Sequence, residues 1–509
     1  MHIMRLRKYL YSSASRNAAA SYIAFISTSL WGLVSIPIAV SYLNAEEIGL
    51  WAVVSAFLGY LAWMDLGVGP ASGRLIADAV ATGDQQEMNR WWSTTRAVLW
   101  SQGFLVILIG AVLLPFLPDL FPIPAALISN ARLMLVGGAV ITGLGLPLRG
   151  AVGLLIAQNR FHWVPLLQTV SPWINLSVFF LLLRSGYGLQ AYIYALAASF
   201  AVEWLAFRTL VSFGPNRLHW DRAGLSRSRL TSLFSLSGNM ALLGLVNSLL
   251  QSLPTMLLAR FAGLGAVPGY NFSAKGPLLG AHLVSRTYQS FYPGLQRLHV
   301  TGQRAIFKAR HRNIGMFVVS FAIMGASFVI ALNHLIVQIL AEADFFVGPR
   351  VNVWFAIALI TTPLSGLFQI LLPISGKMGK SALVSLAKSL VGIAGAAAGW
   401  TLFGIEGLAA VFAILPFIDG AYGYFRGSEN CGYARHELSS KVVIFGGIGI
   451  LSTWFAGLAT SMIKPNGVVM HWCGRKLLLP GPFELIPAAL LLFLGTMCGF
   501  VFFRRLIRH

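Results

Sequence analysis

Two apolar segments near the start of the chain decide the fold: AASYIAFISTSLWGLVSIPIAVSYL at residues 19–43 and GLWAVVSAFLGYLAWMDLGVGPAS at residues 49–72. A bilayer core takes roughly 20 apolar residues in an α-helix, so each segment is long enough to cross a membrane. Similar segments follow one another along nearly the whole chain as far as residue 503. We therefore expect an all-α polytopic membrane protein.

The composition agrees with this expectation. Hydrophobic residues make up 57% of the 509 residues and charged residues only 10%, which is typical of a helical bundle in lipid and excludes an ordinary soluble protein. The formal net charge of +21 comes from basic residues scattered through the loops. No compact basic domain that would bind nucleic acid is visible.

The apolar pattern predicts about fourteen transmembrane helices joined mostly by short polar turns. Their expected ranges are 19–43, 49–73, 97–118, 130–157, 163–183, 188–212, 233–259, 266–292, 313–340, 351–375, 380–403, 405–425, 441–463 and 483–503.

Alternate loops are rich in Lys and Arg, which by the positive-inside rule predicts that both termini are cytoplasmic. The N-terminal segment carries Arg5 and Arg7, and the C-terminal tail carries Arg504 and Arg505. One loop on the expected outer side departs from the rule, because it holds Lys464, Arg475 and Lys476. We expect this loop to tolerate its charge; the alternative is that a late helix is misplaced.

Similar features recur six helices apart and suggest an internal duplication. Pro37 and Gly49 in the first helix pair correspond to Pro254 and Gly269 in the seventh and eighth helices, and a Thr-Gly dipeptide follows each pair. We expect two pseudo-symmetric six-helix lobes followed by two further helices. The expected parts are a cytoplasmic segment 1–18, an N-lobe 19–212, a basic cytoplasmic loop 213–232, a C-lobe 233–425, helices thirteen and fourteen at 426–503, and a tail 504–509.

The first of these helix pairs resembles a known family. YLNAEEIGLW at residues 42–51, MDLGVG at 64–69, RLIA at 74–77 and AQNRF at 157–161 are similar to the oligosaccharide-lipid flippases of the multidrug/oligosaccharidyl-lipid/polysaccharide exporter superfamily. Motif-level similarity is confined largely to residues 20–90, whereas helix number and chain length agree throughout.

The resemblance implies a carrier in the cytoplasmic (inner) membrane. It would turn an undecaprenyl-pyrophosphate-linked glycan from the cytoplasmic to the outer leaflet by alternating access, for O-antigen or another surface polysaccharide. The same resemblance suggests that it works beside a polymerase and glycosyltransferases and is not itself an enzyme.

Cations inside the expected spans favour an anionic substrate independently, because a lone cation in the bilayer needs a partner, a wet cavity or a path to the interface. Lys275 and Arg286 fall on a similar face of one helix, about 16 Å apart. Either such cations bind the substrate's phosphates or they reach towards the headgroups. The substrate-binding candidates are Lys275, Arg286, Lys388, Arg149 and the interfacial Arg74.

Three acids lie inside expected spans: Asp65, Glu203 and Asp419. Each either neutralises a neighbouring cation or couples transport to a proton or sodium ion. Two prolines within spans, Pro37 and Pro254, are hinge candidates for alternating access.

The histidines and three cysteines are dispersed without the spacing of a metal or redox site, so the sequence predicts no metal and no cofactor. Two alternatives to the flippase remain open. One is a drug or cation exporter of the same superfamily, whose cavity should carry uncompensated acids. The other is a membrane-embedded glycan polymerase or glycosyltransferase, which should expose a larger loop or domain with catalytic acids.

Overall fold

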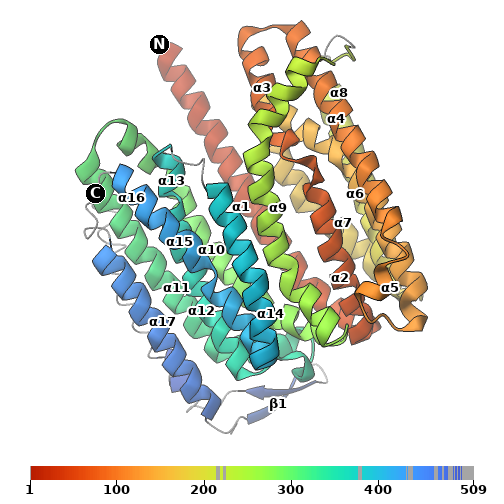
Figure 1. Cartoon of the computed structure of the whole chain (residues 1–509), viewed down its shortest axis with the longest axis vertical. Coiled ribbons are helices and arrows are strands. Elements are labelled where there is room, and N and C mark those ends of the chain that lie inside the picture. The colour runs from red at the N-terminus through yellow and green to blue at the C-terminus, as the bar shows by residue number, and fades with distance from the viewer. Residues whose placement is uncertain are drawn as a thin grey trace. The chain divides into compact units, whose positions relative to one another are not determined.

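The computed structural model describes residues 2–213, 218–221, 225–376, 381–431, 433, 439–462, 468–472 and 475–479, with a few positions between 485 and 495. Within these ranges the chain is almost entirely helical, as expected for an all-α membrane protein (Figure 1). Its contacts divide it into two compact units, residues 1–267 and residues 268–509.

The first unit is a bundle of long helices with short connections. Its elements are α1 (His2–Tyr42), α2 (Ala45–Ala62), η1 (Trp63–Asp65), α3 (Val68–Thr82), α4 (Gln85–Val112), α5 (Leu117–Leu120), η2 (Ala125–Leu127), α6 (Ile128–Ala157), α7 (Trp163–Arg184), η3 (Gly188–Gln190), α8 (Ala191–Ser212) and α9 (Arg227–Phe261).

The second unit continues the same architecture. Its elements are α10 (Ala266–Val300), α11 (Arg304–Leu340), η5 (Ala343–Phe345), α12 (Pro349–Gln369), α13 (Leu371–Ile374), α14 (Ser381–Ile414), α15 (Pro416–Tyr422), η6 (Gly423–Gly427), α16 (Ser428–Asn430), α17 (Ser439–Met462), β1 (Val468–Trp472) and β2 (Arg475–Leu479).

Ten segments of the described chain are long and apolar enough to cross a membrane. One of them, Leu383–Gly427, contains two expected helices, because the chain reverses at Gly404 (φ 60°, ψ −137°). A Cβ on Gly399 would lie 2.7 Å from the carbonyl oxygen of Gly407, so the two arms of this reversal pack backbone against backbone. The expected boundary between residues 403 and 405 is thus confirmed.

The second expected helix, 49–73, is not continuous. It is broken between η1 and α3, where Leu66 (φ 48°) and Gly67 (φ 69°) are both left-handed. The continuous apolar run concealed this break, because hydropathy reports burial in lipid and not backbone direction. Since residues other than glycine rarely adopt positive φ, Leu66 marks a strained position.

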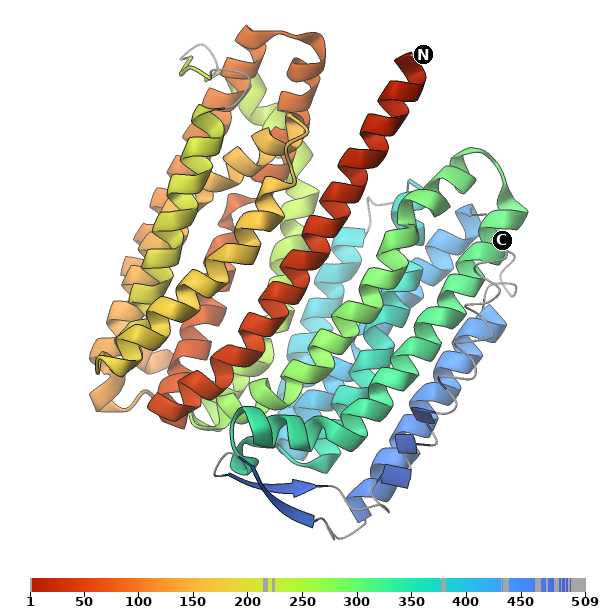
Figure 2. The same ribbon diagram turned by 180° about the vertical axis from the view of Figure 1, so that it is seen from behind.

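A β-hairpin is the one departure from the all-α expectation in the described ranges. Strands β1 and β2 pair antiparallel after α17 (Figure 2), with Trp472 opposite Arg475 and His471 opposite Lys476. Two of the basic residues that broke the charge pattern therefore belong to a folded hairpin. Lys464 and most of the expected helix 483–503 lie outside the described residues, as does the tail.

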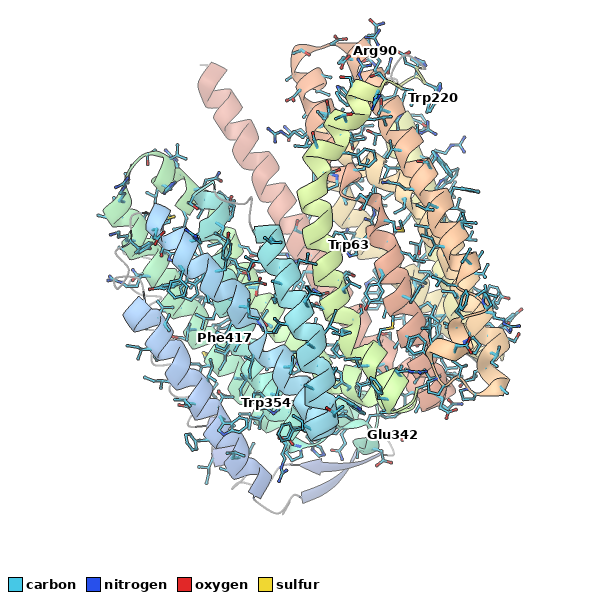
Figure 3. All side chains as sticks on the ribbon, in the orientation of Figure 1. Trp63, Arg90, Trp220, Glu342, Trp354 and Phe417 are labelled. Atoms are coloured by element: carbon cyan, nitrogen blue, oxygen red, sulfur yellow. The ribbon has the colours of Figure 1, made fainter. Side chains whose placement is uncertain are left out.

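The expected lobe boundaries remain predictions. By contacts α9 groups with the first unit, where it packs against α2, α3 and α4. Trp63 lies against α9 because Gly244 has no Cβ to exclude its ring (Figure 3). The two Thr-Gly turns of the expected repeat share one conformation, since Gly83 (φ 71°) and Gly302 (φ 70°) are both left-handed after a helix.

Candidate functional site

The helix break in the first unit holds an intramembrane ion pair. Asp65 is 2% exposed, and its Oδ1 accepts a hydrogen bond from the Gly67 amide at 3.1 Å. Its Oδ2 lies 2.8 Å from Nη1 of Arg149 on α6, whose side chain is 38% exposed. The carboxylate thus both stabilises the break and neutralises Arg149, while part of the guanidinium stays accessible.

Glycines bring the two residues together by letting α3 and α6 approach closely. A Cβ on Gly153 would lie 2.6 Å from the Gly69 carbonyl oxygen and 3.0 Å from the Gly73 amide nitrogen. A Cβ on Gly69 would lie 3.0 Å from that of Arg149. The small residues therefore set the backbone separation at which the Asp65 side chain meets the guanidinium.

The second unit contains a second intramembrane pair. Nζ of Lys388 on α14 donates to Oδ2 of Asp419 on α15, and both residues are buried. A buried charge is stable in such a place only when it is paired, and each of these groups compensates the other. Of the predicted cations and acids, the structure therefore brings together Arg149 with Asp65 and Lys388 with Asp419.

A further row of basic side chains lies on α10. Lys275 and His282 are seven residues apart, which is about 20° short of two full turns, and Arg286 follows four residues later, about 40° beyond one turn. All three side chains therefore project from one face, which we call the α10 stripe (Lys275, His282 and Arg286). Lys275 and Arg286 are half-buried and His282 is exposed.

The opposite face of α10 is packed. Ala281, Val284 and Tyr288 are buried in the hydrophobic core of the second unit. The hydroxyl-bearing edge of Tyr288 fits against Gly366 of α12, and Leu359 of the same helix fits against Gly280. The packing fixes the rotation of α10 about its axis, so the stripe faces away from the core of its own unit.

A buried polar cluster joins α10 to α11 and α12 beside Lys275. Pro277 has no amide hydrogen to donate to the carbonyl of Ser273, and Nδ2 of Asn333 donates to that oxygen instead, at 2.8 Å. The same Nδ2 lies 2.8 Å from Oδ1 of Asn352, whose Nδ2 donates to the Val329 carbonyl at 2.9 Å. The two asparagines therefore satisfy a backbone group that the proline leaves free.

The other predicted residues stay apart from these pairs. Arg74 on α3 is exposed, and Glu203 on α8 is half-buried, with no ion pair to either among the described residues. Pro37 lies inside α1 and Pro254 inside α9. Searched over the described ranges, the chain has no group of three or more His, Cys, Asp or Glu that could hold a metal ion.

Sequence reasoning missed His282 and the asparagine cluster. The spacing of seven residues between Lys275 and His282 predicts that their side chains share one face of the helix, so His282 could have been found from the sequence. The role of Asn333 could not be predicted from the sequence, because its hydrogen-bond partner, the Ser273 carbonyl, is 60 residues away.

Solved structures of transporters share this fold. The lipid II flippase MurJ in an inward closed conformation aligns with a TM-score of 0.65 and 12% identity, over 97% of this chain and 98% of that one. An inward-facing multidrug resistance MATE transporter of the MOP superfamily aligns with a TM-score of 0.60 and 16% identity, over 79% and 94% of the two chains. A mutant of the MATE transporter VcmN from Vibrio cholerae aligns with a TM-score of 0.60 and 18% identity, over 82% of this chain and 97% of that one. At such identities the likeness shows the fold alone.

The family follows from the sequence itself. The model of the polysaccharide biosynthesis protein family matches residues 14–299, which is more than half of the chain. The chain belongs to this family, and its ten apolar segments and its fold are those of a multi-pass membrane protein. No curated protein sequence shows significant similarity to it.

Proposed function

We propose that the protein flips an undecaprenyl-pyrophosphate-linked oligosaccharide from the cytoplasmic to the outer leaflet, for surface polysaccharide synthesis. The α10 stripe is the observation that carries this proposal. It presents three basic side chains in a row on a long helix of the second unit, and α10 is not one of the ten described segments that are apolar enough to cross a membrane. Pyrophosphate is the part of such a substrate that needs compensating charge in the membrane.

The stripe is suited to an anion because Lys275 adds a charge that no described acid of its own unit cancels. No acidic side chain pairs with Lys275 in the part of the chain that the structure describes. Inside a membrane, a cation that faces neither an acid nor the protein core is stable only beside water or an anionic ligand. A diphosphate moving along α10 would meet Arg286, His282 and Lys275 in turn, at intervals of about 6 and 10 Å.

A drug or cation exporter is the second candidate function. The two intramembrane ion pairs argue against it. Such a carrier needs acids that are free to attract a cation. Asp65 and Asp419 are instead engaged by Arg149 and Lys388. Glu203 is the one predicted acid without such an ion pair among the described residues, and it is therefore our choice for an ion-coupling site.

The remaining parts of the proposal follow the resemblance to oligosaccharide-lipid flippases. The carrier lies in the cytoplasmic membrane with both termini in the cytoplasm and works by alternating access, with bending at Pro37 and Pro254. Arg74 meets the substrate's phosphates at the cytoplasmic interface. Glycosyltransferases supply the glycan before it is flipped, and a polymerase consumes it afterwards.

Deleting the gene and assigning lipid-linked intermediates to a leaflet tests the function. A membrane-impermeant glycan probe should find the intermediates on the cytoplasmic side, with surface polysaccharide lost. Normal polysaccharide with raised sensitivity to cationic drugs would favour the exporter. Intermediates held on the outer leaflet would contradict flipping, because they would place the missing step after translocation.

A further inference from the structure

The α10 stripe contains one group that can change its charge near neutral pH. His282 is exposed and lies near the midpoint of α10, sixteen residues after its first residue and eighteen before its last. Lys275 and Arg286 project from the same face of α10, one on each side of His282 along the helix. Unlike these two, a histidine in water is protonated only below about pH 6.5.

Asp419 of α15 is engaged by Lys388 of α14, which also carries Glu406. The face of α10 that carries His282 is turned away from α11 and α12, and the basic and histidine side chains of α11 lie towards the two ends of that helix. α12 carries Arg350 in its first turn and no other charged residue. An anion that binds at the stripe would therefore lie beside His282 as well as beside the two cations.

We propose that His282 binds a proton when a phosphate group binds the stripe, so that proton uptake and substrate binding are linked. This inference rests on the proposed function. A bound diphosphate places negative charge beside the imidazole ring, and a nearby opposite charge favours the imidazolium. The proton comes from water, goes to a ring nitrogen of His282, and leaves again when the anion departs.

The linkage has a direction that can be worked out. A group that gains a proton on binding makes the ligand bind more tightly as pH falls through its titration range. A carrier with this property takes up one proton with each anionic headgroup and releases both together. Glu203 is not needed for this step. The proton linkage at His282 and the proposed ion-coupling site at Glu203 can therefore be tested separately by mutation.

Binding of two anions to the purified full-length protein in detergent tests the linkage. The probes are farnesyl diphosphate and sulfate, because sulfate stays a dianion throughout pH 5.5–8 and reports protein titration alone. We expect wild-type protein to bind sulfate at least about fivefold more tightly at pH 5.5 than at pH 7.5. His282→Gln should remove most of this difference, and His282→Lys should bind tightly at both pH values. His162→Gln, in the turn before α7, is the matched control and should behave as wild type.

The outcomes separate the two proposals. An unchanged pH dependence in His282→Gln would overturn the linkage, even with diphosphate binding intact. Failure of wild-type protein to bind either anion at any pH would contradict the cationic substrate path itself and the linkage with it. Retention of monodisperse elution by both His282 variants shows that lost binding is not lost folding.

Discussion

Nη1 of Arg149 lies 2.8 Å from Oδ2 of Asp65, which places an intramembrane cation against the carboxylate of a helix break. The other carboxylate oxygen accepts from the Gly67 amide at 3.1 Å. One acid thereby performs two tasks: it neutralises a charge from α6 and replaces a hydrogen bond that α3 cannot form at its first turn. This pair couples the shape of the chain between α2 and α3 to the position of α6.

Replacing Asp65 by Asn should destabilise the protein by about 1–3 kcal/mol, because it leaves the Arg149 charge uncompensated. The loss is below that of a fully buried pair, since the guanidinium is 38% exposed and can reach water. Thermal unfolding in detergent measures it. Asp65→Asn combined with Arg149→Gln should be more stable than the sum of the single changes predicts. Strict additivity would show that the two side chains do not interact.

Lys388 and Asp419 should behave as a structural pair. Asp419→Asn should lower stability and the amount of protein in the membrane, because it strands a buried ammonium group. Lys388→Met combined with Asp419→Leu removes both charges and should restore both quantities, with transport retained. Loss of transport in this double variant at wild-type abundance would instead identify the pair as a substrate or coupling site.

A methyl group at the α3–α6 contact should separate the Asp65 pair. Gly153→Ala puts a Cβ 2.6 Å from the Gly69 carbonyl oxygen, so one backbone must shift, and we expect a loss of about 1–3 kcal/mol. Gly59→Ala in α2 is the matched control, since no atom outside the adjoining backbone of its own helix lies within 4 Å of its Cβ position. The control should be neutral or stabilising by up to about 1 kcal/mol. Equal losses in the two variants would mean that close packing is not the cause.

The asparagine cluster predicts an unusual rescue. Asn333→Leu should cost about 1–3 kcal/mol, because it leaves the Ser273 carbonyl without a donor. Pro277→Ala supplies an amide hydrogen that can bond this carbonyl within α10, so Asn333→Leu should be milder in that background. A double-mutant cycle of melting temperatures measures the difference. The same penalty in both backgrounds would contradict a role for Asn333 in compensating the proline.

Much of the fold could be predicted from the sequence, because spanning length and apolarity are local properties of the chain. The reversal at Gly404 was predicted to within a residue, since polar and glycine residues interrupt the apolar run there. The break at Leu66 was not predicted. It depends on left-handed backbone angles that nothing in hydropathy reports, and on an amide that only the folded Asp65 side chain satisfies.

The site was predicted in part for a similar reason. Lys275 and Arg286 could be placed on one helix face, because helical periodicity fixes their relative direction. The pairing of Arg149 with Asp65 was expected only in general form, as one of two meanings for an intramembrane acid. Choosing between those meanings needed the packing of α3 on α6, which connects residues 84 positions apart (149 − 65) and leaves no periodic signal in the sequence.

The most direct test of the cationic path is translocation of an undecaprenyl-pyrophosphate-linked oligosaccharide by purified protein in liposomes. An impermeant glycan-cleaving enzyme counts the molecules that have crossed. Lys275→Ala combined with Arg286→Ala should reduce the rate at least about tenfold, whereas Lys275→Arg should be milder. Arg132→Ala removes an exposed cation of α6 that is not part of the stripe, and it should leave the rate unchanged. Wild-type translocation by the double variant would contradict the account.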